Sequence, residues 1–137
     1  MTPVSQYIAN KTSELKSIGA TVTLYEIKNS TNEDWRRFRN IVLWVGHLAI
    51  SSHVEIRKLE DGESELIEDN VYTVLDFHPL TVTVGGRKRP DRFVCTSTVS
   101  IVDAVKKART IIDEWIVEKE SELQKERELR SLLGYFQ

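Results

Sequence analysis

The chain contains the basic run Gly85-Gly86-Arg87-Lys88-Arg89-Pro90-Asp91. Its glycines and proline predict a hairpin loop between two strands, with cationic side chains above a flexible base. A guanidinium group binds a phosphate or carboxylate with two parallel hydrogen bonds, so Arg87, Lys88, Arg89 and the following Arg92 form a candidate anion site. The alternative is a solvated loop whose charges keep the end of a hairpin from aggregating.

A second basic element, Trp35-Arg36-Arg37-Phe38-Arg39, places two aromatic residues among three arginines. Aromatic rings stack on bases and arginines neutralise phosphates, and sites for nucleotides and single strands combine both. The sequence therefore predicts stacking by Trp35 and Phe38, with phosphate contacts made by Arg36, Arg37 and Arg39. The alternative is a helical turn in which the two rings are core anchors and the arginines extend into solvent.

Charge is unevenly distributed although the formal net charge is only -2. Residues 85–109 hold seven cationic and two acidic residues, a balance of +5, whereas residues 53–69 hold the reverse, a balance of -5. The small net charge argues against general binding to long nucleic-acid duplexes. The segregation still allows a basic surface for one phosphate-bearing ligand: a nucleotide, a signalling nucleotide or a single-stranded nucleic acid.

Residues able to do catalytic or metal chemistry are sparse. The three histidines do not show the spacing of a metal site, and the single cysteine, Cys95, cannot form an intramolecular disulfide or a multi-cysteine zinc site. Asp76 and His78 would share one side of a strand, where the carboxylate could orient the imidazole as a general base. We expect no metal, no cofactor and no catalytic residues. A small cytosolic enzyme of unidentified reaction is kept as a second alternative.

The elements that would position these residues follow from apolar periodicity and turn residues. A short helix is expected from Pro3, capped by Thr2, to a stop at Gly19. Alternation of apolar and polar residues between turn signals predicts strands at 20–28, 41–45, 48–59, 71–77, 80–84 and 92–96. A hairpin centred near Lys88 would place Cys95 opposite Thr81. Short strands with short connections indicate an antiparallel meander.

The C-terminal third predicts one long helix, from the cap Ser100 to the stop at Gly134, with an apolar face that begins at Ile101. Continuous over 101–133, it would be about 50 Å long, whereas a globule of this size has a radius of gyration of about 14 Å. The helix must therefore bend back or project. The expected fold class is α+β in a single domain: an N-terminal helix (1–19), an antiparallel sheet of five to six strands (20–97), and a C-terminal helix or helical arm (98–137) that packs on the sheet and extends beyond it.

The predicted arm is highly charged but carries apolar residues toward its end. Nine of the thirteen residues 118–130 are charged. An exposed apolar tip on such a helix is typical of a contact with another subunit or protein. The candidate contact residues are Trp115, Leu123, Leu129, Leu132, Leu133, Tyr135 and Phe136. The alternative is a solvated helix stabilised by side-chain pairs along its surface.

These features favour a non-enzymatic, self-associating protein that captures a phosphate-bearing ligand through its arginine-rich elements. The alternative is a protein interaction module, such as a small viral or mobile-element inhibitor or adaptor, that acts through its C-terminal helix. The N-terminus lacks a secretory signal, and the longest apolar stretch, 41–45, is far shorter than the roughly 20 residues of a membrane-spanning helix. We therefore expect a cytoplasmic homo-oligomer with no membrane contact, whose partner is a nucleotide, a single nucleic-acid strand or a protein.

Overall fold

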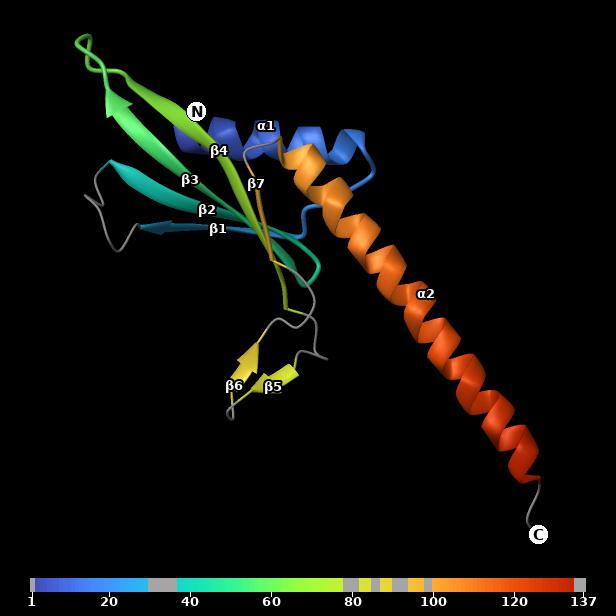
Figure 1. Cartoon of the computed structure of the whole chain (residues 1–137). Helices are drawn as coiled ribbons and strands as arrows, with labels where there is room; N and C mark the ends of the chain where they lie inside the picture. The colour runs from blue at the N-terminus through green and yellow to red at the C-terminus, as the bar shows by residue number, and fades with distance from the viewer. Residues whose placement is uncertain are drawn as a thin grey trace.

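The computed structural model describes residues 2–29, 37–77, 82–84, 87–89, 94–97 and 100–134. The fold is α+β, as the sequence predicts, with a short N-terminal helix, a five-stranded antiparallel sheet and a long C-terminal helix (Figure 1). In chain order the elements are α1 (Pro3–Ser17), β1 (Leu24–Asn29), β2 (Phe38–Val45), β3 (Leu48–Lys58), β4 (Ser64–Asp76), β5 (Val82–Val84), β6 (Arg87–Arg89), β7 (Val94–Ser97) and α2 (Ile101–Leu133).

Both helices begin at the predicted caps. The Thr2 hydroxyl accepts a hydrogen bond from the backbone N–H of Ser5 at 3.1 Å, and Pro3 is the first helical residue. The Ser100 hydroxyl accepts from the backbone N–H of Asp103 at 3.3 Å. These side chains satisfy backbone donors that have no partner within the helix, which is why serine and threonine are favoured at these positions.

The main sheet is a meander with the strand order β1-β2-β3-β4-β7, and every neighbouring pair is antiparallel. Strands β2 and β3 are joined by a two-residue turn in which Gly46 has a φ of 62°, a conformation that glycine adopts without strain. The β3–β4 register shifts between Ser52 and Val54, and Asn70 on β4 has a φ of 55°. This irregularity determines which β4 side chains meet the helices.

Three strand predictions need correction. Strand β4 begins at Ser64, seven residues before the predicted start at Val71, because its acidic first half pairs with β3 despite lacking apolar alternation. The basic residues Arg87–Arg89 are strand β6, which pairs with β5 in a separate two-stranded sheet, so the prediction of a loop here is wrong. Cys95 pairs with Val74 of β4 and not with Thr81, because β7 joins the main sheet whereas β5 pairs with β6 in the separate sheet.

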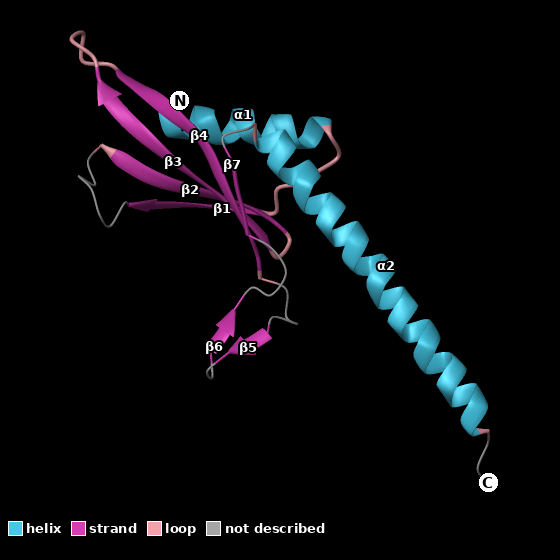
Figure 2. Cartoon of the chain, in the orientation of Figure 1, coloured by secondary structure: helices cyan, strands magenta, loops and turns pink. Residues whose placement is uncertain are grey.

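Helix α1 and the first third of α2 cover one face of the main sheet (Figure 2). The core between them is formed by alternate residues of β2, β3 and β4 together with Tyr7, Ile8 and Leu15 of α1 and Ile101, Ala104 and Ala108 of α2. The two alanines are 0% and 1% exposed, and their small side chains let α2 approach closely. Beyond this contact α2 projects away from the sheet (Figure 1).

Within the described part of the chain, no helix is both long and apolar enough to cross a membrane. The long helix α2 does not meet this description because charged residues occupy most of its second half.

Candidate functional site

The packing of α2 on the core formed by the described residues ends about one third of the way along the helix. The buried residues of α2 are Ile101, Ala104 and Ala108, and the last α2 residues packed against the core are Ile111 and Ile112. From Asp113 to the end of the helix every described residue except Trp115 is exposed. These 21 residues span about 31 Å at 1.5 Å per residue, so the projecting alternative for the arm is confirmed and the folded-back alternative is wrong.

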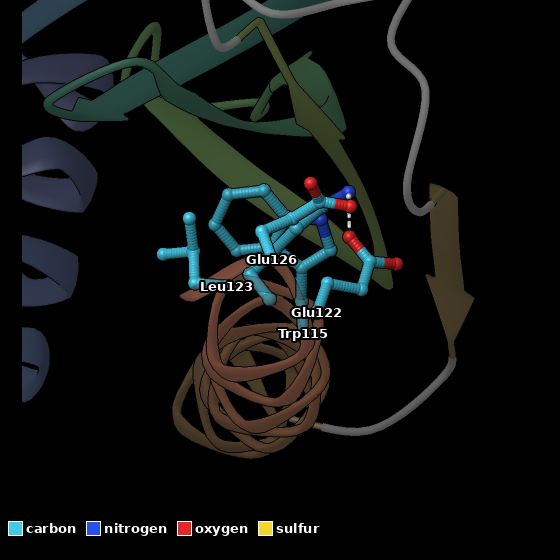
Figure 3. A pocket seen from close by; sticks show the side chains of 5 residues that line it. Trp115, Glu122, Leu123 and Glu126 are labelled. Atoms are coloured by element: carbon cyan, nitrogen blue, oxygen red, sulfur yellow. Dashed lines mark hydrogen bonds and ion pairs between the residues drawn. The ribbon is translucent and has the colours of Figure 1, made fainter. Parts of the chain in front are cut away.

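The side of α2 that packs on the sheet continues along this projecting arm. Helical residues three and four apart lie on one side, and Trp115 follows Ala108 and Ile112 at those spacings. Beyond Trp115, a shallow hollow of about 520 Å³ lies along the helix, and its lining residues are Trp115, Lys119, Glu122, Leu123 and Glu126. Viewed nearly along the helix axis, their side chains leave the helix on one side (Figure 3).

The hollow combines an apolar floor with charges of both signs. The Lys119 ammonium lies 3.2 Å from a carboxylate oxygen of Glu122 and 5.8 Å from the centre of the Trp115 ring. This arrangement places the Lys119 ammonium over the Trp115 ring in a cation–π contact while it is paired with Glu122. The surface is therefore suited to a partner helix that brings both apolar and oppositely charged side chains.

Apolar residues of the arm are exposed, as the sequence predicts for a contact surface. Leu123 is 53% exposed, Leu129 50% and Leu133 61%, while Leu132 reaches 85%. Exposed leucines on an otherwise charged helix form a surface that gains from burial against a partner. Of the other candidate contact residues, Trp115 lies in the hollow, and Tyr135 and Phe136 lie outside the described residues.

The structure describes only part of the predicted anion site. Trp35, Arg36 and Arg92 lie outside the described residues, and Arg87–Arg89 are described by their backbone alone. Phe38 and Arg39 begin β2, so the helical-turn alternative is wrong for these two residues. The structure therefore does not show the two basic elements meeting around one ligand.

The described residues of this basic element already have partners within the chain. Arg37 forms an ion pair with Glu55, and its hydrogen bond lowers the pKa of that carboxyl group. The Phe38 ring stacks on His53 with a centroid distance of 5.2 Å and an interplanar angle of 8°, while Arg37 lies 5.3 Å from the same ring. Arg39 donates a hydrogen bond to the Phe38 carbonyl at 2.8 Å. Stacking of a base on Phe38 would have to displace one of these contacts.

A buried polar network that the sequence did not predict joins α1 to the sheet. The Tyr7 hydroxyl lies 2.9 Å from the Ser52 hydroxyl, and Tyr72 donates a hydrogen bond to Glu68. The Lys11 ammonium lies 3.0 Å from the same Glu68 oxygen. Burial raises the pKa of Tyr72, and the bond to Glu68 adds to this effect. Burial alone would lower the pKa of Lys11, but the hydrogen bond and charge of Glu68 outweigh it and raise that pKa.

Asp76 lies beside a different histidine from the one expected. Its carboxylate is 0% exposed and lies 2.9 Å from Nδ1 of His47, which comes from the turn between β2 and β3. The strand pairing of Asp76 with Leu48 brings the two side chains together across 29 positions of sequence. His78 lies outside the described residues. A buried carboxylate that orients a partly exposed imidazole is a suitable arrangement for proton transfer, and it also fixes the turn to the end of β4.

Among the described residues, no group of three or more histidine, cysteine or acidic side chains could hold a metal ion. No family model matches the chain, and neither the curated proteins nor the solved structures contain a match. Function must therefore be inferred from the surfaces described above.

Proposed function

We propose that the protein is a self-associating interaction module in which the α2 arms of two copies pair as antiparallel helices. The observation that carries this proposal is the continuation of the core-facing side of α2 beyond Trp115, where every described residue of the helix is exposed. Most of the stability of a helix in a protein comes from packing of one face. A projecting arm of about 31 Å gains that packing by pairing with a second arm.

The arm carries the spacing of a short coiled coil. Apolar or hollow-lining residues recur at alternating intervals of three and four, and these seam residues are Ile112, Trp115, Lys119, Glu122, Glu126 and Leu129. This is the repeat that keeps one seam of a helix facing its partner. Leu129 is 50% exposed, and its full burial against a partner contributes about 1.5–3 kcal/mol; a symmetric pair buries it twice.

The charges in the seam favour the antiparallel arrangement. In a parallel pair in register, Lys119 would face the partner's Lys119, and Glu122 would face the partner's Glu122. Like charges on facing positions destabilise helix pairs. In an antiparallel pair with Lys119 opposite the partner's Glu122, opposite charges meet twice. The same register places Ile112 opposite the partner's Leu129 and Trp115 opposite the partner's Glu126.

Sedimentation of the full chain at several concentrations tests self-association. A single copy has a mass of 15.8 kDa. We expect the weight-average mass to rise toward at least twice that value as the concentration increases, because dimer formation follows mass action. A mass that stays at 15.8 kDa across the micromolar range would overturn the proposal.

Capture of a phosphate-bearing ligand stays a prediction from the basic segments of the sequence. If it occurs, the cations of residues 87–92 would supply the contacts, because Arg37 is engaged with Glu55. Binding would then weaken steeply as the salt concentration rises.

A further inference from the structure

Strand β1 forms one edge of the main sheet and is unusually accessible. It pairs with β2 on one side and has no neighbouring strand on the other among the described residues (Figure 1). Five of its six residues are exposed. Leu24, Tyr25 and Ile27 are 57%, 55% and 48% exposed, which is high for large apolar side chains in a sheet. An edge with free backbone groups and apolar side chains is a template for pairing with another strand.

The sequence of β1 is complementary to itself when two copies run antiparallel. If Ile27 lies opposite the partner's Ile27, Glu26 faces the partner's Lys28, and Lys28 faces the partner's Glu26. Opposite charges directly across an antiparallel pair stabilise it, by about 0.2–1 kcal/mol for each pair. The central isoleucines then form an apolar cross-strand contact between two ion pairs.

Neighbouring registers lack this complementarity. Moving the centre of symmetry to Glu26 places that carboxylate opposite its own copy, and moving it to Lys28 places two ammonium groups opposite each other. Shifts by a single residue exchange the two faces of the strand. Of the three registers centred on Glu26, Ile27 and Lys28, only the one centred on Ile27 places Glu26 and Lys28 opposite residues of opposite charge.

Existing contacts hold the charged residues of β1 in place for such pairing. Glu26 accepts a hydrogen bond from the Trp44 indole at 2.8 Å through one carboxylate oxygen, and its other oxygen lies 3.7 Å from the Lys28 ammonium. Both side chains therefore lie on the sheet face that points away from the helices, the face that also carries Trp44. Tyr25 and Ile27 lie on the helix side of the strand, because alternate residues point to opposite faces.

We infer that β1 is a second self-association surface, whose occupant is β1 of another copy paired antiparallel about Ile27. This pairing joins two five-stranded sheets into one continuous sheet with both sets of helices on the same face. On that face Tyr25 of each copy lies diagonally across from the partner's Ile27, within reach for apolar contact. The inference goes beyond the α2 contact of the proposed function. Together, two different symmetric contacts on one chain would link dimers into larger assemblies.

Cysteine cross-linking of the full chain tests the symmetry centre directly. In a Cys95→Ser background, Ile27→Cys places two thiols opposite each other, at a separation that a disulfide can bridge. We expect a covalent dimer under mild oxidation. The matched control is Tyr25→Cys, on the same face and of similar exposure, whose copies would lie four positions apart and should cross-link at least about tenfold less. Equal cross-linking of the two variants, or none with Ile27→Cys, would overturn the inference.

Charge reversal provides a second measurement that is independent of α2. Glu26→Lys in the Ile27→Cys chain should reduce the cross-linking rate, and Glu26→Lys with Lys28→Glu should restore it. Adding Lys119→Glu, which weakens the proposed α2 contact, should leave the cross-link at Ile27 in place. A failure of the α2 contact and a failure of the β1 contact therefore give different results. A double reversal that stays as slow as the single one would contradict the pairing.

Discussion

Lys119→Glu should raise the dimer dissociation constant of the full chain at least about tenfold, the equivalent of 1.4 kcal/mol. In the antiparallel pair, each Lys119 lies opposite the partner's Glu122, so one substitution replaces two attractive contacts with two repulsive ones. Each change of sign on facing helix positions is worth about 0.5 kcal/mol before other terms. The substituted side chain also removes the lysine that covers the Trp115 ring. Sedimentation equilibrium on both proteins measures the difference.

The charge swap Lys119→Glu with Glu122→Lys should return the dissociation constant to near the original value, because the opposite charges again face each other. The control is Arg127→Glu, an equal change of charge at an exposed position away from the seam. If Arg127→Glu weakens the dimer as much as Lys119→Glu, net charge and not the seam governs association. A swap that fails to recover would exclude the proposed register.

Glu68→Ala should lower the free energy of unfolding by about 2–3 kcal/mol, because it leaves a buried ammonium and a buried hydroxyl without their acceptor. The Lys11 side chain is only 12% exposed and the Tyr72 side chain only 1%. Glu68 itself is 26% exposed, which reduces the loss from that expected for a fully buried pair. Urea unfolding followed by circular dichroism measures the change.

Two further variants separate the role of Glu68 from a general loss of packing. Glu14→Gln removes the other carboxylate near Lys11, 3.5 Å away and 44% exposed, and should cost less than about 0.5 kcal/mol. Lys11→Met combined with Glu68→Leu replaces both charges with apolar groups and should recover the part of the stability that the unpaired ammonium costs. If the double variant has a lower free energy of unfolding than Glu68→Ala, the interaction between Lys11 and Glu68 itself stabilises the fold, beyond preventing an unpaired buried charge.

The type and order of the elements could be predicted because their signals are local. The caps Thr2 and Ser100 and the apolar repeat of α2 each lie within a few residues of the helix they define. The predicted length of about 50 Å for α2 required the helix either to bend back or to project from a globule of this size. Length alone left both alternatives open, and the structure shows that the arm projects.

The polar sites could not be predicted because they depend on strand pairing. Glu68 and Tyr72 meet below α1 because the β3–β4 register shifts between Ser52 and Val54. No sequence motif predicts this shift. His47 contacts Asp76 because Leu48 pairs with Asp76. From the sequence we expected Asp76 to orient His78, which is nearer along the chain. The partner of Arg37 is likewise distant in sequence, so the pattern of aromatic and basic residues suggested a ligand where Glu55 lies.

Intermolecular spin-label distances test the antiparallel α2 pair most directly. Labels are attached to Asp113→Cys or to Ser121→Cys in a Cys95→Ser background, both at exposed positions of the arm. With Lys119 opposite the partner's Glu122, Ser121 lies almost level with its copy, whereas Asp113 is offset from its copy by 15 residues, about 22 Å along the axis. We expect a clearly longer distance between the labels at position 113 than between those at position 121. Equal short distances at both positions, or no intermolecular distance at either, would contradict it.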